Sequence, residues 1–216
     1  MAALDRWVIN SALASLADAE NTLEISLATF CINVSAQSFR DDSFVDFIEA
    51  RVAESGVPPD TLCFEITETS LVRHIEQAQR FVHRLQRLGC LVALDDFATG
   101  YSSFAYLKTL PVNYLKIDGS FVRDILENDL SKAIVNAVVN IADVIGAQTV
   151  AEHVENEMVQ AWLRKAGVHF VQGFVVHRPE PLAAVLDSMD GLSGIFDSDS
   201  ESIDLRLSPT DQSATS

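Results

Sequence analysis

The sequence is poor in cysteine and contains no long apolar run. Its three cysteines, Cys31, Cys63 and Cys90, fit neither a disulfide framework nor the paired spacing of a zinc site, so we expect buried thiols in a reducing compartment. The N-terminus lacks the basic and apolar regions of a signal peptide, and no apolar run approaches the roughly 20 residues that cross a bilayer. These absences predict a cytoplasmic protein with no membrane segment.

Basic residues are also scarce. The chain has 15 Lys and Arg residues against 31 Asp and Glu residues, which gives a net charge of −16 at pH 7. A surface of this charge repels the phosphates of nucleic acids and of anionic membranes, so neither DNA nor RNA is an expected partner. An acidic protein can still bind an anionic substrate if divalent cations screen the repulsion.

The length and the hydrophobic content set the domain organisation. With 216 residues, of which 48% are hydrophobic, the chain can bury the core of one sizeable domain. We expect this domain to cover residues 1–190. Beyond Gly191 the chain becomes rich in Asp and Ser and ends in polar residues, so residues 191–216 are expected to be a disordered acidic tail.

Apolar residues alternate along the chain between helical spacing and short continuous runs. The chain opens in an expected amphipathic helix that includes Leu4 and Leu16, and six pairs of a strand and a helix follow. The connections are too long for hairpins, which favours parallel strands joined by right-handed crossovers and hence an α/β fold. The expected strands cover residues 24–36, 62–66, 91–94, 114–117, 149–151 and 168–171, and the expected helices include residues 70–88, 134–145 and 182–189.

The stretch LVALDDFATGYSS, residues 91–103, combines a buried strand with two acids. Four apolar residues end at Asp95 and Asp96, and a loop through Gly100 follows; Ser102 or Ser103 can cap the next short helix. Carboxylates at the carboxyl end of a parallel strand lie where α/β folds place their active sites. Asp is also a common helix cap and turn former, so a purely structural role remains an alternative at this point.

Each of the six expected strands carries a polar residue at or near its carboxyl end. In a closed parallel barrel these strand ends meet over one pocket. Carboxylate and carboxamide oxygens are the ligands that Mg²⁺ or Mn²⁺ prefers, although Asp95 and Asp96 share a site only if the strand pattern breaks between them. The alternative is a set of caps and ion pairs, for instance Lys116 with Asp95. The residues are Asn33, Glu65, Asp95 with Asp96, Lys116, Glu152 and Gln172.

The order and spacing of six motifs identify a family. INVSAQSF, CFEITE, LDDFATGYSS, LPVNYLKIDGSFV, TVAEHVE and VQGF together resemble the EAL domain, a bacterial phosphodiesterase that opens cyclic di-GMP to linear pGpG. The resemblance covers roughly residues 4–186. It implies a TIM-like (β/α) barrel with one antiparallel strand and a site for two Mg²⁺ or Mn²⁺ ions.

The resemblance also implies a role for individual residues. Glu68 matches the residue that anchors the loop after Asp95 and Asp96, a loop linked in this family to metal binding and dimerisation. Lys116 matches the lysine that holds the attacking water, and Glu152 matches the essential glutamate at the metal-bound water. The implied metal ligands are Asn33, Glu65, Asp95 and Asp96, and Asp96 also holds water. Gln172 matches a glutamine of the site that comes late in the family's sequence. Asp118 and Glu155 are expected to contact the residues of the site rather than the metal itself.

Four features depart from the family pattern. Ala98 and His153 replace the usual Gly, and an Ala is strained where a positive φ is required. For His153, a surface or capping role is expected rather than a new metal ligand. Phe174 replaces a common Tyr, which is a mild change. The Glu-Ala-Leu motif itself, whose Glu is a metal ligand in the family, is missing from the chain.

The missing motif shapes what we expect of the whole chain. The domain is expected to be truncated before the motif, leaving an incomplete barrel of about six strands. Such an open sheet exposes edges, so we expect instability, a homodimer or completion by another chain. Two functions follow: metal-dependent hydrolysis of cyclic di-GMP, or a catalytically inactive module that binds cyclic di-GMP or a protein partner.

Overall fold

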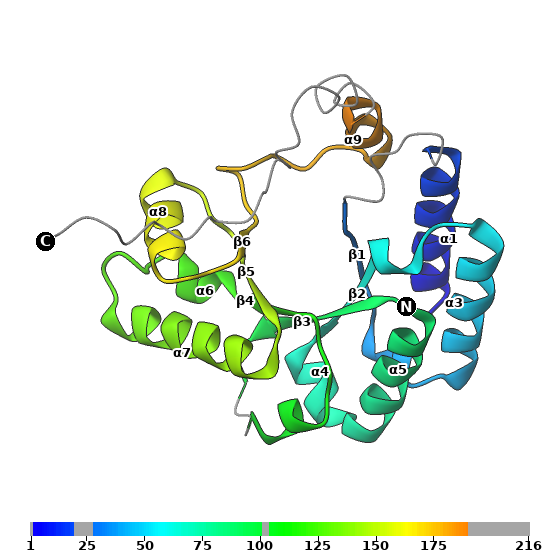
Figure 1. The fold of residues 1–216 in the computed structure, drawn as a ribbon, viewed down its shortest axis with the longest axis horizontal. Helices are drawn as coiled ribbons and strands as arrows, with labels where there is room; N and C mark the ends of the chain where they lie inside the picture. The colour runs from blue at the N-terminus through cyan, green and yellow to red at the C-terminus, as the bar shows by residue number, and fades with distance from the viewer. Residues whose placement is uncertain (1, 20–27, 101–103, 190–216) are drawn as a thin grey trace, which may run out of the picture. The chain divides into compact units, whose positions relative to one another are not determined.

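The computed structural model describes residues 2–19, 28–100 and 104–189 of the chain (Figure 1). These residues form two compact units, one of residues 2–113 with 179–189 and the other of residues 114–178. Each unit contains three strands, and the strand pairs described within each unit are parallel, so the expected α/β class is confirmed. The expected tail at 191–216 and the expected cap at Ser102 or Ser103 lie outside the described residues.

The sheet of the first unit consists of β1 (Phe30–Asn33), β2 (Leu62–Thr67) and β3 (Leu91–Phe97), in that order. Asn33 is in register with Glu65, which in turn is in register with Ala93. In β2, all residues from Leu62 to Ile66 are buried, as in a parallel strand that is covered on both faces.

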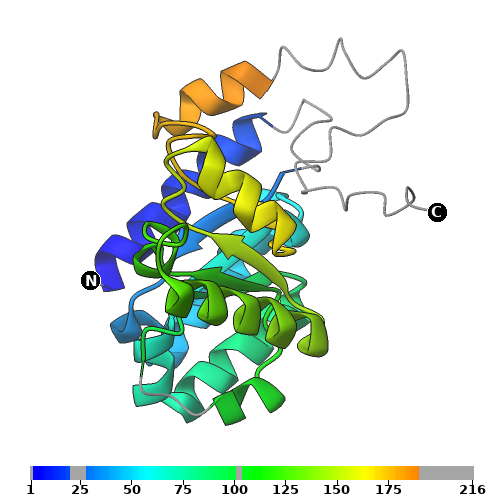
Figure 2. The same cartoon turned by 90° about the vertical axis from the view of Figure 1, so that its left-hand side faces the viewer.

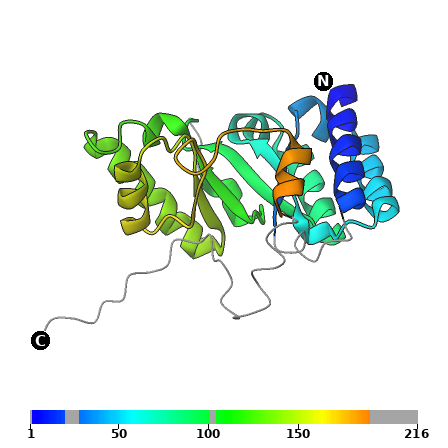
Figure 3. The same ribbon diagram turned by 90° about the horizontal axis from the view of Figure 1, so that it is seen from above.

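Helices cover the sheet of the first unit. α1 (Ala2–Ala19) packs against α3 (Asp42–Ser55), α3 packs against α5 (Ile75–Leu88), and α9 (Leu182–Met189) lies beside α1 (Figures 2 and 3). Their apolar faces meet in a core that includes Ile9, Phe44 and Phe81. The shorter elements of this unit are α2 (Ala36–Phe39), η2 (Pro59–Thr61), α4 (Glu68–Arg73) and η3 (Phe104–Lys108).

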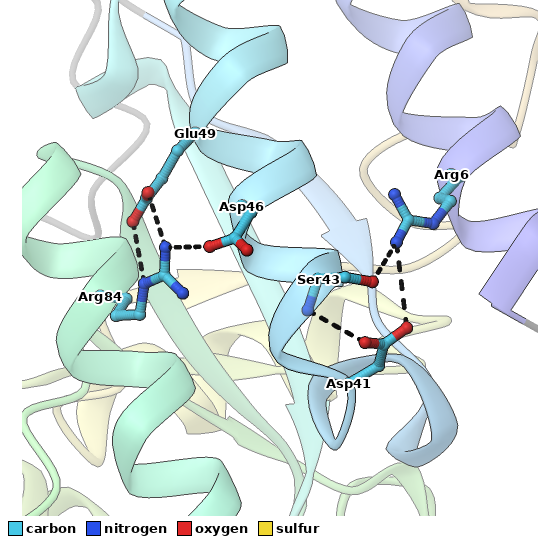
Figure 4. Close-up of polar contacts among 6 residues, drawn as sticks. All are labelled: Arg6, Asp41, Ser43, Asp46, Glu49 and Arg84. Atoms are coloured by element: carbon cyan, nitrogen blue, oxygen red, sulfur yellow. Dashed lines mark hydrogen bonds and ion pairs between the residues drawn. The ribbon is translucent and has the colours of Figure 1, made fainter.

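Polar contacts join these outer helices at their solvent-facing edges (Figure 4). Arg84 of α5 donates hydrogen bonds to Glu49 and Asp46 of α3, over distances of 2.6 to 3.0 Å. Arg6 of α1 donates to the Ser43 hydroxyl at 3.0 Å. Because most of these side chains are partly exposed, each pair contributes modestly to stability, and the buried apolar faces provide the main stabilisation.

The second unit contains β4 (Tyr114–Ile117), β5 (Gln148–Ala151) and β6 (Phe170–Val171), again in sequence order. Its helices are α6 (Gly119–Val122), α7 (Asp129–Ile145) and α8 (Glu157–Lys165), and α7 packs against β4 and β5. Asn128 caps α7 by accepting hydrogen bonds from the next turn, and Asn156 caps α8 in the same way. These caps fix where the two long helices begin.

The structure corrects several expected boundaries. The helix expected over residues 70–88 is divided into α4 and α5 at His74, whose φ of −138° is not helical. The strand expected over residues 168–171 is confined to Phe170–Val171. Within the described part of the strand expected over residues 24–36, β1 covers only Phe30–Asn33, and α2 begins at Ala36.

The expectation that the cysteines are buried is correct for Cys63 and Cys90 and wrong for Cys31. Burial raises the pKa of the Cys90 thiol to about 12. Cys31 is exposed, because its side chain alternates with that of buried Ile32 and projects from the other face of β1.

None of the described helices is both long and apolar enough to cross a membrane.

Candidate functional site

Three oxygen-bearing side chains share one face of the sheet in the first unit. Residues in register on neighbouring parallel strands point to the same face, as do residues two apart on one strand. Asn33 is in register with Glu65, Glu65 is in register with Ala93, and Asp95 lies two residues beyond Ala93. Asn33, Glu65 and Asp95 therefore project from the same face, near the carboxyl ends of β1, β2 and β3.

The burial of these three side chains differs. Glu65 is only 4% exposed, Asp95 is half-buried and Asn33 is exposed. A carboxylate inside an apolar strand costs free energy, and a divalent cation is a partner strong enough to offset that cost. An amide oxygen and two carboxylates are hard donors that suit Mg²⁺ or Mn²⁺. This set of donors fits the expected metal ion.

The backbone changes direction at Asp96. Its φ is +52°, in the left-handed region, although strand β3 continues to Phe97. The hydroxyl of Thr99 donates to the carbonyl oxygen of Asp96 at 2.8 Å and closes a turn after it. The regular alternation of the strand is interrupted at this residue, so Asp96 is not constrained to the face opposite Asp95.

Glu68 holds the loop that follows Asp96. Its side chain is fully buried at the start of α4. Oε2 accepts a hydrogen bond from the backbone N–H of Ala98 at 3.0 Å, and Oε1 accepts one from the Tyr106 hydroxyl at 2.8 Å. Ala98 has a φ of +72°, a left-handed conformation that is strained for a residue with a Cβ, so the bond to Glu68 helps to hold an unfavourable backbone.

Tyr106 contacts Glu68 and is not among the residues expected from the sequence. It lies in η3, is 9% exposed and connects this short helix to Glu68. Burial, together with the hydrogen bond to Glu68, raises the pKa of the phenol, so the hydroxyl stays protonated and donates. The only sequence signal was a tyrosine inside the otherwise apolar run FAYL, because a buried tyrosine hydroxyl needs an acceptor.

In the second unit, Lys116 and Glu152 form a buried ion pair. Lys116 Nζ lies 2.7 Å from Glu152 Oε1, and the two side chains are 6% and 12% exposed. Lys116 is in register with Val150, and Glu152 follows Val150 by two residues, so both side chains share one face of the sheet. The backbone N–H of Glu152 donates to the carbonyl of Ile117 at 3.2 Å, which extends the ladder by one residue and fixes this geometry.

Gln172 follows directly after β6, where its backbone is held on both sides. Its N–H donates to Ala151 at 2.8 Å, and its carbonyl accepts from Val154 at 3.0 Å. The next residue must be Gly, because a Cβ on Gly173 would lie 2.2 Å from the carbonyl oxygen of Val154. The VQGF motif thus reflects close backbone packing as well as a polar side chain at the strand end.

The two residues expected to support the site have different surroundings. Asp118 caps α6 by accepting from the N–H of Ser120 at 2.9 Å. Burial alone would raise the pKa of Asp118, but the hydrogen bonds from Ser120, together with the nearby Arg123 and His153, outweigh this effect and lower the pKa. Glu155 is exposed in the connection between β5 and α8.

His153 has a left-handed backbone and packs over Gly119. Its φ is +56° and its side chain is exposed. A Cβ added to Gly119 would lie 2.6 Å from His153 Nδ1 and 2.9 Å from His153 Cβ. The imidazole therefore occupies the space that a side chain at position 119 would need.

This contact gives a testable coupling between the two positions. We expect Gly119→Ala to lower the free energy of unfolding by about 1–3 kcal/mol, because the whole imidazole must move. In a His153→Gly background, the same substitution is expected to cost less than about 1 kcal/mol. Urea unfolding of the two single variants and the double variant measures the coupling. An equal cost of Gly119→Ala in both backgrounds would contradict the packing.

Comparisons with known proteins place the chain in a family. A family model described as the EAL domain matches residues 1–179. The Escherichia coli cyclic di-GMP phosphodiesterase PdeF is 36% identical over 187 residues, which are 87% of this chain and 25% of PdeF. The EAL domain of Mycobacterium smegmatis DcpA superposes with a TM-score of 0.83 at 35% identity, over 88% of this chain and 85% of that one.

A second solved structure carries a ligand. The PaMucR phosphodiesterase, in its c-di-GMP complex, superposes with a TM-score of 0.80 at 30% identity and covers 84% of this chain and 73% of that one. These structures share the TIM-like arrangement expected from the motifs, which confirms the expected fold class for this chain, with six of its strands described. The chain spans a quarter of the length of PdeF.

Proposed function

The chain belongs to the EAL domain family, and on this premise we propose that it hydrolyses cyclic di-GMP to linear pGpG with Mg²⁺ or Mn²⁺. The observation that carries the proposal is the common face of Asn33, Glu65 and Asp95. These residues, with Asp96, are proposed to hold the metal. When bound, the ions supply the charge that screens the phosphodiester and activates a water molecule.

Lys116 and Glu152 are proposed to handle the attacking water. The ammonium group of Lys116 can donate a hydrogen bond that orients the water oxygen, and the carboxylate of Glu152 can accept a proton from it. Their 2.7 Å ion pair holds the two groups in fixed positions next to each other before substrate arrives. Attack at phosphorus breaks the bond to the 3′ oxygen, which takes up a proton and becomes the free hydroxyl of pGpG.

The other proposed residues act on these groups. Glu68 and Tyr106 are proposed to fix the position of the loop after Asp96. The hydrogen bonds that Glu68 accepts from Ala98 and from Tyr106 support this role. Gln172 is proposed to contact the substrate, and Asp118 and Glu155 are proposed to contact the other residues of the site.

We further propose that the protein is cytoplasmic and that it does not bind DNA or RNA. We also propose that it forms a homodimer or is completed by another chain.

A second candidate function has its own support. The PaMucR structure, to which the chain is similar, is a complex with c-di-GMP. We propose as the alternative a catalytically inactive module that binds cyclic di-GMP or a protein partner. Binding and turnover therefore have to be measured separately.

Calorimetric titration of cyclic di-GMP into the 216-residue chain with Ca²⁺ tests the feature that both nucleotide functions share. We expect one nucleotide to bind per chain, and Asp95→Asn to weaken binding at least about 10-fold because a metal ligand loses its charge. Asp60→Asn, at an exposed position in η2, is the matched control and should bind normally. A folded chain that binds no nucleotide would contradict both nucleotide functions and leave the protein-partner role.

A further inference from the structure

A buried acid on α1 makes hydrogen bonds that the proposed chemistry does not use. Asp5 is 6% exposed, and its Oδ2 accepts three hydrogen bonds from a segment about 30 residues away. The donors are the backbone N–H of Ser35 at 3.0 Å, the Ser35 hydroxyl at 2.6 Å and the Ser38 hydroxyl at 2.6 Å. One carboxylate oxygen thus organises the connection between β1 and α2.

The protonation state of Asp5 agrees with this arrangement. Burial alone would raise the pKa of Asp5, but the hydrogen bonds from Ser35 and Ser38 outweigh it and lower the pKa. The group is therefore charged at neutral pH, and hydrogen bonds to a charged acceptor are shorter and stronger than neutral ones. An isosteric amide in its place would accept the same bonds more weakly.

The clamped segment begins directly after a proposed metal ligand. Asn33 ends β1, and Ser35 follows two residues later as the first residue of the turn into α2. The N–H of Val34 donates to the carbonyl of Glu65 at 2.9 Å, which ties the same turn to β2. Among the described strands of this unit β1 lies at the edge, so its end depends on β2 and on the bonds to Asp5.

We propose that Asp5 is a positioning residue for the metal site: by holding Ser35 and Ser38, it keeps the amide oxygen of Asn33 level with the carboxylate of Glu65. This inference rests on the proposed metal role of Asn33 and Glu65. Asp5 acts through the backbone and touches neither metal nor substrate. Substitution of a residue that orients a metal ligand without touching the metal typically lowers metal affinity by about 10- to 100-fold.

Calorimetric titration of Mn²⁺ into the full chain and its variants tests the proposal. We expect Asp5→Asn to raise the dissociation constant for Mn²⁺ about 10-fold. Ser38→Ala removes one of the three donors, folds more readily and is expected to give a smaller increase. Amide exchange of residues 33–38 should become faster in both variants, because their clamp is loosened.

The matched control is Thr61→Val. Thr61 is 2% exposed, and its hydroxyl donates to the carbonyl of Pro58 at 2.7 Å just before β2 begins. We expect this variant to lower the unfolding temperature without changing the Mn²⁺ dissociation constant. If Asp5→Asn and Ser38→Ala lower only the unfolding temperature and leave Mn²⁺ affinity within twofold, the positioning role is overturned and the metal site stands. A wild-type chain that binds no Mn²⁺ overturns the proposed site and, with it, the role of Asp5.

Discussion

Replacing Glu152 with glutamine is expected to lower kcat for cyclic di-GMP hydrolysis by about 1,000-fold. Glutamine keeps the shape of the side chain, but it cannot accept a proton from water and cannot form an ion pair with Lys116. The pair is 2.7 Å long and nearly buried, so the remaining ammonium group also loses its ordered partner. Single-turnover assays with product chromatography measure the loss at saturating substrate.

Glu157→Gln is the matched control for this prediction. Glu157 is exposed in the first turn of α8, five residues along the chain from Glu152, and it carries the same charge. We expect its hydrolysis rate to equal that of the wild type. Nucleotide binding should survive in Glu152→Gln, because the proposed metal ligands are unchanged. Rates of Glu152→Gln within threefold of the wild type would rule out its role in proton transfer.

The second large effect is expected at Glu68. In Glu68→Gln, the amide nitrogen faces either the N–H of Ala98 or the hydroxyl of Tyr106, and one buried donor is left without an acceptor. We expect a loss of about 2–3 kcal/mol in the free energy of unfolding. The loop after Asp96 also loses its fixed position, and kcat is expected to fall about 100-fold, since small displacements of reacting groups are costly.

Two variants separate the loop effect from a general loss of stability. Tyr106→Phe removes one hydrogen bond to Glu68 and keeps the bond to Ala98, so it should lose stability with a smaller loss of kcat. Glu76→Gln, at an exposed position of α5, should change neither quantity. Urea unfolding and initial rates at saturating Mn²⁺ measure both quantities. A Glu68→Gln variant that is destabilised but fully active would contradict the anchoring role.

The strands, the parallel α/β fold and the candidate side chains could be predicted from the sequence. A buried parallel strand is a short run of apolar residues, and polar residues follow at its end. It also indicated that Asp95 and Asp96 could share a site only after a break in the strand, and the φ of +52° at Asp96 provides one. Asn33, Glu65 and Asp95 share one face because of the register of the three strands. The hydrophobic pattern does not specify this register, because the strands are continuous apolar runs without alternation.

Contacts between distant segments could not be predicted in the same way. The bonds of Asp5 to Ser35 and Ser38 join residues that are about 30 positions apart, and no local pattern encodes them. The division of the helix expected over residues 70–88 at His74 was missed because its apolar spacing is continuous on both sides. The exposure of Cys31 does not follow from its residue type, because cysteine is usually buried and the face of the strand decides its exposure here.

Product chromatography of cyclic di-GMP incubated with the purified 216-residue chain and Mn²⁺ tests the central claim most directly. The proposed function predicts that linear pGpG accumulates in proportion to enzyme and time, that EDTA stops its formation and that Glu152→Gln forms almost none. Unchanged cyclic di-GMP, with a folded chain that binds the nucleotide in calorimetry, would contradict hydrolysis and establish the binding module instead.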